Sequence, residues 1–380
     1  MNATSEALHV RRVTARVFRC PLETPVTTSF GIMRDRPALL VEIEDGDGVR
    51  GWGEVWCNFP GVGAEHRARL IDSVLAPLLL DAPVATPRDG FERMTQRTHV
   101  LALQSAEPGP FAQAIAGLDV ALWDLAARRA GVPLYALLDP AADPEIPVYA
   151  SGLNPDKPET LAAAKQAEGY TAFKLKVGFG EARDLANLAA LREALGGAAE
   201  LMADANQGWD IETALAVAPK MERFALKWLE EPLRADRPWT EWARLRAATG
   251  IPLAAGENVA GVGGFDAALA ANVLGVVQPD LAKWGGFSGT LPVAQRIRAA
   301  GARYCPHYLG GGIGLLASAH LLAAVGGDGL LEIDSNPNPL RTEICGPLTM
   351  IVGGRTTLPA EPGLGIEPDL AALSAFARPH

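Results

Sequence analysis

Short apolar segments alternate with alanine-rich segments of helical periodicity from about residue 145 onwards, and this alternation constrains the fold more than any other feature. Short buried strands separated by helices indicate parallel pairing through right-handed crossovers. Eight such units close into a (β/α)₈ barrel, so we expect an α/β fold of the TIM-barrel type. The eight expected strands are Ile146–Gly152, Ala172–Val177, Glu200–Asn206, Leu226–Glu231, Pro252–Glu257, Gly275–Asp280, Arg303–Tyr308 and Leu330–Asp334.

The residues before the barrel predict a second, smaller domain. A simple barrel takes about 250 residues, so a chain of 380 leaves on the order of 130. Strand patterns joined by hairpin chemistry at Asp45–Gly48 are followed by helical patterns at Ala64–Leu80 and Phe111–Leu138. The expected organisation is an α+β domain over 1–138, a barrel over 139–350, and a C-terminal segment over 351–380 that packs back on the first domain.

Charge and hydropathy exclude several classes of partner. The formal net charge of −10 argues against nucleic acid and against anionic membrane surfaces, because both attract basic proteins. No apolar run approaches the roughly 18 residues of a membrane span, and we expect no export signal. The four cysteines lack any C-x-x-C pair, which predicts free thiols and a cytoplasmic location.

Polar residues end the expected barrel strands, although the strands are otherwise apolar. They recur at intervals of 23 to 28 residues, about one strand-helix unit. Because the C-terminal ends of barrel strands converge on one mouth, we expect these side chains to meet around a pocket. They are Lys174, Lys176, Asp204, Asn206, Glu230, Glu231, Glu257, Asp280, His307 and Glu332.

Three carboxylates on adjacent strands, Asp204, Glu230 and Glu257, indicate a metal site. They would repel one another in a half-buried pocket unless a cation lay between them. An all-oxygen set suits a hard ion, so we expect Mg²⁺, with Mn²⁺ as a substitute. Each acid taken singly is explained as well by helix capping or ion pairing, but three in register favour the metal.

The two lysines of the strand at 172–177 alternate and project from the same face. Their mutual proximity, burial and a nearby cation would lower a lysine pKa and make one of them a usable base.

Asp280 and His307 end neighbouring strands, so the carboxylate can orient the imidazole. The glycine-rich loop at 310–314 can cradle an anion with its amides, or it only permits a tight turn.

Taken together, these motifs resemble the enolase superfamily, and within it the mandelate racemase subgroup, over essentially the whole chain. The resemblance implies that Asp204, Glu230 and Glu257 hold Mg²⁺, with Glu230 rather than Glu231 as the ligand. The matching motifs are Lys174-Leu175-Lys176, Asp204-Ala205-Asn206, Leu229-Glu230-Glu231-Pro232, Gly256-Glu257-Asn258, Gln278-Pro279-Asp280 with Lys283, Pro306-His307 and Leu331-Glu332.

The resemblance also implies the roles of the remaining site residues. Lys176 is expected to act as a base on one face of the substrate, and His307, paired with Asp280, as acid or base on the other. Lys174 would tune Lys176, and a protonated Glu332 would donate a hydrogen bond to the substrate carboxylate.

In this family the N-terminal domain caps the barrel and shapes the substrate pocket. The corresponding loops here are at 24–36 and 52–62, and we expect Trp56 and Asn206 to contact the substrate. The segments at 332–341 and 362–366 are similar to those of members that act on acid sugars, including galactarolactone cycloisomerases and acid-sugar dehydratases.

The expected function is Mg²⁺-dependent abstraction of a proton α to a carboxylate, with stabilisation of the enolate. Dehydration of an acid sugar is the leading expectation, because such a substrate supplies a β-hydroxyl as leaving group. The alternatives are a racemase, epimerase or cycloisomerase acting on a hydroxy acid or sugar lactone, and a non-catalytic binding protein. The expected partner is a small anionic carboxylate, and the chain is expected to form a homo-oligomer.

Overall fold

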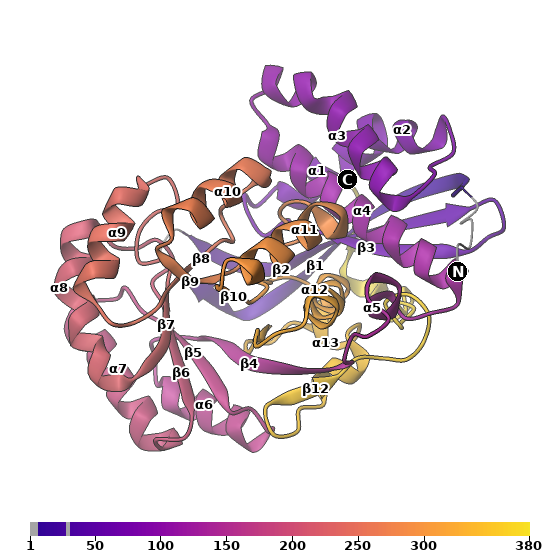
Figure 1. Cartoon of the computed structure of the whole chain (residues 1–380). Helices are drawn as coiled ribbons and strands as arrows, with labels where there is room; N and C mark the ends of the chain where they lie inside the picture. The colour runs from indigo at the N-terminus through magenta and orange to yellow at the C-terminus, as the bar shows by residue number, and fades with distance from the viewer. Residues whose placement is uncertain (1–6, 28–30) are drawn as a thin grey trace.

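The eight expected barrel strands are all present and pair in parallel, in the order β10-β9-β8-β7-β6-β5-β4-β11. The computed structural model describes residues 7–27 and 31–380. Figure 1 shows a curled sheet with helices on its outer side, which confirms the TIM-barrel-type fold. The strands are β4 (Glu145–Leu153), β5 (Ala172–Lys176), β6 (Glu200–Asp204), β7 (Leu226–Glu230), β8 (Leu253–Ala255), β9 (Leu274–Val277), β10 (Arg303–Tyr304) and β11 (Leu331–Asp334).

The ring is closed by side chains where β10 meets β11, because no backbone ladder joins these two strands in the part of the chain that the structure describes. Strand β10 has two residues, and Pro306 soon after it has no N–H to donate to a ladder. Instead, Leu330 N donates to Cys305 Sγ at 3.4 Å, and Tyr308 N donates to Glu332 Oε2 at 3.2 Å.

The interior of the barrel is a packed apolar layer that lies beneath the site. Trp228 and Tyr149 meet edge to face there, with their ring centroids 5.4 Å apart. The buried residues of this layer are Tyr149, Ala172, Met202, Trp228, Ala254, Val276 and Cys305. Inward-facing residues alternate along each strand, so the next inward positions after this layer carry the polar groups of the mouth.

The outer helices follow the strands as the alternation predicts. Helix α12 is buried along nearly its whole length, which explains why its sequence is apolar on all sides. The helices are α6 (Pro158–Ala167), α7 (Glu181–Leu195), α8 (Ile211–Met221), α9 (Trp239–Ala248), α10 (Gly261–Ala271), α11 (Gly286–Ala299) and α12 (Gly312–Val325), followed by the short α13 (Pro339–Thr342).

The N-terminal domain combines an antiparallel sheet with a layer of helices. Gly131, at φ 69°, ends α4 in the left-handed conformation and so divides the helical pattern expected over Phe111–Leu138. Helix α3 was not predicted from the sequence. The elements are β1 (Val10–Thr27), β2 (Ile32–Asp45), β3 (Arg50–Val55), α1 (Gly63–Leu70), a π-helical turn (Ile71–Leu75), α2 (Ala76–Leu80), α3 (Pro87–Gln104), α4 (Pro108–Ala130) and α5 (Leu134–Leu138).

Residues 351–380 contact both parts of the molecule. Strand β12 (Arg355–Thr357) pairs antiparallel with β4 and extends the barrel sheet. Strand β13 (Ala377–Arg378) pairs with β1 and extends the N-terminal sheet. The segment therefore packs both on the N-terminal domain and on the barrel.

Three buried carboxylates of the N-terminal domain accept hydrogen bonds from other segments. Glu54 accepts from Gly311 N and Gly314 N in the barrel at 2.5 and 2.9 Å. Asp119 accepts from Ser288 Oγ at 2.6 Å, and Asp124 accepts from Leu364 N at 2.6 Å. Burial raises the pKa of Glu54 and of Asp119 to about 7 and that of Asp124 to about 6. These bonds fix how the domain sits on the barrel, because each buried oxygen needs its donor.

Among the described residues, the helices are all too short or too polar to span a membrane.

Replacing Ser288 by alanine tests this attachment. Its hydroxyl donates to Asp119 and accepts from Trp123 Nε1 at 2.9 Å, so Ser288→Ala removes one hydrogen bond from a buried carboxylate and one from a partly buried indole N–H. We expect the free energy of unfolding to fall by about 1–3 kcal/mol in urea titrations. The exposed Ser73→Ala control is expected to change it by less than about 0.5 kcal/mol. Equal effects of the two substitutions would contradict this role of Ser288.

Candidate active site

A cavity of about 960 Å³, counting the solvent at its mouth, opens at the C-terminal ends of the barrel strands. The two residues expected to contact substrate, Trp56 and Asn206, both line it, one from the N-terminal domain and one from the barrel. The remaining predicted residues that line it are Lys176, Glu257, His307 and Glu332. Lys174, Asp204, Glu230 and Asp280 are buried and do not line the cavity among the residues described.

Lys174 is a fully buried ammonium group that joins three strands. Its Nζ lies 2.5 Å from Glu230 Oε1, 2.8 Å from Glu332 Oε1 and 3.9 Å from Asp204 Oδ2. Burial opposes its charge, but the carboxylates of Glu230 and Glu332 outweigh burial and hold the pKa of Lys174 well above its usual value. Lys174 is therefore protonated and joins the carboxylates of neighbouring strands beneath the cavity.

Lys176 lines the cavity and pairs with Asp204, with 2.6 Å between Nζ and Oδ2. Burial opposes the charged form, but Asp204 outweighs burial and the repulsion from Lys174, so the pKa of Lys176 is raised. Proximity and burial of the two lysines therefore do not lower the pKa of Lys176 by themselves, and the expected lowering depends on the nearby cation. Each ammonium group is in contact with a carboxylate, and this attraction exceeds the repulsion between the two lysines.

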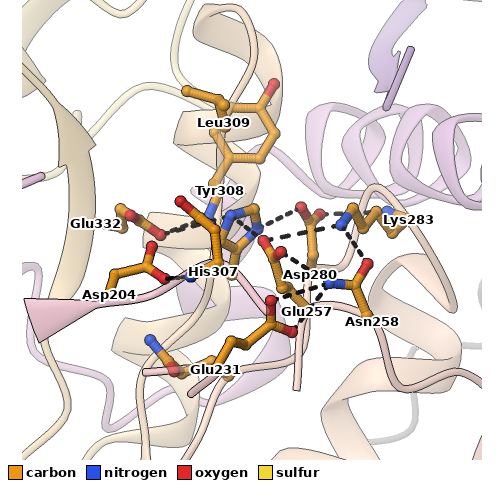
Figure 2. A network of polar contacts seen from close by, with 12 residues as sticks. Asp204, Glu231, Glu257, Asn258, Asp280, Lys283, His307, Tyr308, Leu309 and Glu332 are labelled. Carbon is orange, nitrogen blue, oxygen red and sulfur yellow. Dashed lines mark hydrogen bonds and ion pairs between the residues drawn. The ribbon is translucent and has the colours of Figure 1, made fainter. Parts of the chain in front are cut away.

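His307 lies between carboxylates from three neighbouring strands (Figure 2). Its Nδ1 donates to Asp280 Oδ2 at 2.8 Å, so the expected pair is formed. Its Nε2 contacts Glu257 and lies 3.9 Å from Glu332 Oε2. Burial opposes the imidazolium, but Glu257 and Glu332 outweigh burial and raise the pKa of His307 well above its usual value. His307 is thus poised as a proton donor.

Glu332 is ionised, which corrects the expectation of a protonated donor. Burial favours the neutral acid, but Lys174 and His307 outweigh burial and lower the pKa of Glu332 to about 2. Ser151 Oγ donates to Glu332 Oε1 at 2.5 Å. In this charge state Glu332 accepts hydrogen bonds and cannot donate one.

The three expected metal ligands reach the same end of the barrel, but each is paired with a base. Asp204 pairs with Lys176, and Glu257 contacts His307 and lies 3.7 Å from Lys283 Nζ. Glu230 accepts from Lys174, from Trp228 Nε1 at 3.0 Å and from Gln278 Nε2 at 2.7 Å. Within the described ranges, no three acidic, histidine or cysteine side chains form a ready-made ligand set.

Glu231 is a fourth carboxylate of this cluster. Its backbone turns to φ 38°, and Asn258 Nδ2 donates to its Oε1 at 2.9 Å. Burial, together with the charges of Glu257 and Asp204, raises the pKa of Glu231 well above its usual value. The Glu-Glu-Pro motif places Glu231 next to Glu230 at the end of the strand, but only Glu230 was expected to bind the metal.

The donor set fits a hard divalent cation. Six carboxyl groups meet three lysines and one histidine among the described residues of the mouth, so the acids outnumber the bases there. The raised pKa of Glu231 reflects this crowding, which a bound cation would relieve. Oxygen ligands and this excess of acids suit Mg²⁺. Displacing Lys176 and His307 from their carboxylates would free Asp204 and Glu257 to bind it.

The glycine-rich loop after His307 binds a carboxylate of the protein itself. Oxygens of Glu54, on β3, accept from Gly311 N and Gly314 N, and the Tyr308 hydroxyl also bonds to Glu54. The interpretation of the loop as a cradle for a bound anion is therefore wrong. Glu54 was not selected from the sequence, although an acid in an otherwise apolar strand is a usable signal.

Amide side chains form much of the remaining wall, and most were not predicted. Asn336 Nδ2 donates to Gly152 O, and Asn154 Nδ2 donates to Asn336 Oδ1, both at 2.9 Å. The amides that line the cavity are Asn58, Asn154, Asn206, Gln207, Asn258 and Asn336. Neutral donors and acceptors of this kind suit a ligand with many hydroxyl groups.

Both predicted pocket loops contribute side chains to the cavity. The loop at 52–62 supplies Trp56, Asn58 and Phe59. The loop at 24–36 supplies Arg36, while its residues 28–30 lie outside the described residues.

The sequence matches two family descriptions that together span most of the chain. Residues 11–139 match the N-terminal domain of mandelate racemase/muconate lactonizing enzyme, and residues 159–372 match the enolase C-terminal domain-like family. The D-galactarolactone cycloisomerase of Agrobacterium fabrum is 33% identical over 94% of this chain and 96% of its own length. The L-talarate/galactarate dehydratase of Salmonella typhimurium is 32% identical over 85% of this chain and 81% of its own length.

Solved structures agree with this relationship. A mandelate racemase/muconate lactonizing enzyme from Bordetella bronchiseptica RB50 superposes with a TM-score of 0.92 at 60% identity, covering 97% of this chain and 99% of its own. A racemase from Streptomyces coelicolor A3(2) with bound magnesium superposes with a TM-score of 0.86 at 31% identity, covering 97% and 100%. The chain is therefore an enzyme of the enolase superfamily and belongs to its mandelate racemase/muconate lactonizing enzyme family.

Proposed function

We propose that the protein abstracts the proton α to the carboxylate of an acid sugar with the aid of Mg²⁺, and then eliminates the β-hydroxyl as water. The observation that carries this proposal is the placement of Lys176 and of the His307–Asp280 pair around one cavity. Lys176 ends β5 and His307 follows β10. Around the closed ring these strands are separated by β4 and β11 on one side and by β6 to β9 on the other, so the two side chains approach a bound substrate from different sides.

Elimination needs one base and one acid, and Lys176 and His307 supply these two groups. Lys176 takes the α-proton, and the electron pair of the broken C–H bond enters the enolate. The imidazolium of His307 gives its proton to the β-hydroxyl as the C–O bond breaks, and water leaves. Asp280 holds the imidazole through Nδ1, which keeps Nε2 directed at the leaving oxygen. The enol product then tautomerises to a 2-keto acid.

Bound by Asp204, Glu230 and Glu257, Mg²⁺ would supply the positive charge that stabilises the enolate, and would engage the Asp204 carboxylate that pairs with Lys176 here. Lys176 could then lose its proton and act as the base. Lys174 remains beneath the site and supplies a second positive charge toward the developing enolate.

The amide wall supports a sugar acid as substrate. Hydroxyl groups both donate and accept hydrogen bonds, and the amides of Asn154, Asn206 and Asn258 can do the same. The relatives include enzymes named for the talarate, galactarate and galactarolactone that they act on.

The second candidate function is opening of a sugar lactone ring. It is favoured by the 33% identity with a D-galactarolactone cycloisomerase over nearly the whole chain. The first step at Lys176 is the same, but the leaving oxygen belongs to the ring, so no water is released. Racemisation or epimerisation would differ again, because the proton returns to the α-carbon and the hydroxyls stay.

A product assay separates these reactions. Acid sugars and their lactones are incubated with the protein and Mg²⁺ in D₂O, and products are followed by NMR. Dehydration predicts a 2-keto acid with one water lost, and ring opening predicts an isomer of the lactone. Deuterium at the α-carbon without a 2-keto product would rule out dehydration in favour of epimerisation. No exchange and no product from any acid sugar would support a binding protein instead.

Removing the Lys176 amine tests its role as base. Lys176→Met is expected to reduce kcat by about 10²- to 10⁴-fold, because the α-proton then has no acceptor on that face. The matched control is Lys227→Met on β7, whose exposed amine pairs with Glu200 far from the cavity. The control is expected to retain full activity, and a Lys176→Met enzyme that does the same would refute the assignment.

Metal binding can be measured without substrate. We expect calorimetry to detect one Mg²⁺ site, EDTA to abolish turnover, and added Mg²⁺ to restore it. Glu230→Gln is expected to weaken Mg²⁺ binding at least 10-fold, because a charged ligand is lost. The control is Glu200→Gln, whose partly exposed carboxylate pairs with Lys227 instead. Comparison with Glu231→Gln decides between the two acids: a loss confined to Glu231→Gln would assign that residue as the ligand.

A further inference from the structure

Around Asp334, at the end of β11 that meets the N-terminal domain, the cavity wall carries more positive than negative charge. Arg36, from β2, places Nη2 2.7 Å from Asp334 Oδ2, and Arg341, from α13, places Nη1 3.3 Å from the same oxygen. All three side chains are buried, with Arg36 only 2% exposed. Two guanidinium groups therefore share one carboxylate, and one positive charge is not compensated there.

Asp334 has no further capacity to neutralise Arg36. Its Oδ1 already accepts from Asn336 Nδ2 at 2.8 Å and from Asn336 N at 3.1 Å. Burial favours the neutral acid, but Arg36 and Arg341 outweigh burial and lower the pKa of Asp334, so it is ionised. The neighbouring side chains on this wall, Asn154 and Asn336, are neutral amides.

Arg36 also has unused hydrogen-bonding capacity. Its Nε is buried and has no hydrogen-bond partner among the described residues, and its Nη1 lies 3.6 Å from the sulfur of Met33. A buried donor without an acceptor is unusual in a folded protein. Arg36 and Asp334 line the cavity, whereas Arg341 lies behind Asp334 and is not among the described lining residues. The uncompensated charge is thus presented to a ligand by Arg36.

We propose that Arg36 binds a second carboxylate of the substrate, so that the enzyme acts on a sugar diacid rather than on a sugar monoacid. This inference rests on the proposed function and names the substrate class within it. The guanidinium is the side chain best suited to a terminal carboxylate, because its fork of N–H donors matches the two oxygens.

The spacing of the two ends agrees with a six-carbon diacid. Asp334 follows Glu332 by two residues on β11, which places it roughly 7 Å nearer the mouth at about 3.3 Å per residue. An extended chain advances about 3.5 Å over three bonds, so the five C–C bonds of a hexarate span about 6 Å. The length of such a diacid is therefore close to the distance along β11 from the level of Glu332 to the level of Asp334, where Arg36 binds.

The experiment compares pairs of substrates that differ only at the far end. Galactarate and glucarate are each tested against galactonate and gluconate, in which a hydroxymethyl group replaces the second carboxylate. The wild-type enzyme is expected to show a kcat/KM roughly 10- to 100-fold higher for the diacid of a reactive pair. Arg36→Gln is expected to remove this preference mainly through KM, and Arg36→Lys to restore part of it.

The control variant is Arg19→Gln, another N-terminal-domain arginine, which pairs with Glu65 and Asp35 and does not line the cavity. It is expected to keep the diacid preference. If Arg36→Gln does not fold, two measurements on the wild-type enzyme still test the proposal. One is the ratio of kcat/KM for diacid and monoacid, and the other is the inhibition constant of unreactive dicarboxylates of increasing length, which are expected to bind most tightly near six carbons.

The outcomes separate this inference from the proposed function. Equal wild-type kcat/KM values for monoacids and diacids would overturn the role of Arg36 and leave the proposed function standing. A uniform loss on both classes in Arg36→Gln would make Arg36 a structural residue only. Failure of every acid sugar to react or exchange its α-proton would overturn the proposed function itself.

Discussion

A buried ammonium group, that of Lys174, is the interaction on which the site depends. Its side chain is fully buried, so carboxylates of β7 and β11 must neutralise it, and this brings Glu230 and Glu332 to within 3 Å of one atom. The other charged side chains of the mouth are paired in the same way, Asp204 with Lys176 and Glu257 with His307. The mouth of the barrel is therefore a balanced network in which moving one charge alters the partners of the others.

The N-terminal domain takes part in this network without contributing a base. Glu54 binds the loop that begins directly after His307, while two residues further along the chain Trp56 lines the cavity and stacks under Lys283, whose Nζ lies 4.8 Å from the ring centroid. The end of β3 thus binds the loop that follows His307 and also forms part of the wall of the substrate cavity. Because the Glu54 carboxylate is buried, losing the loop amides would leave its oxygens without hydrogen-bond donors, and this ties the position of the loop to that of β3.

The strands and the polar residues at their ends could be predicted because a single spacing encodes both. Lys176, Glu257 and His307 each follow an apolar strand by the same rule, so their meeting at one mouth follows from the fold. Their charge states could not be predicted in this way. The pKa values of Lys176 and Glu332 depend on contacts between different strands, 2.6 Å from Lys176 to Asp204 and 2.8 Å from Glu332 to Lys174, which sequence spacing does not contain. Arg36 was missed for a similar reason, since its partner Asp334 lies 298 residues away.

The path of the C-terminal segment has a consequence for the order in which the molecule is completed. Strand β13 covers one edge of β1, yet more than 300 residues separate the two strands in the chain. On the ribosome, the N-terminal sheet emerges before the barrel, and this edge stays open while all eight barrel strands are synthesised. The N-terminal domain is thus made before the barrel but completed only after it.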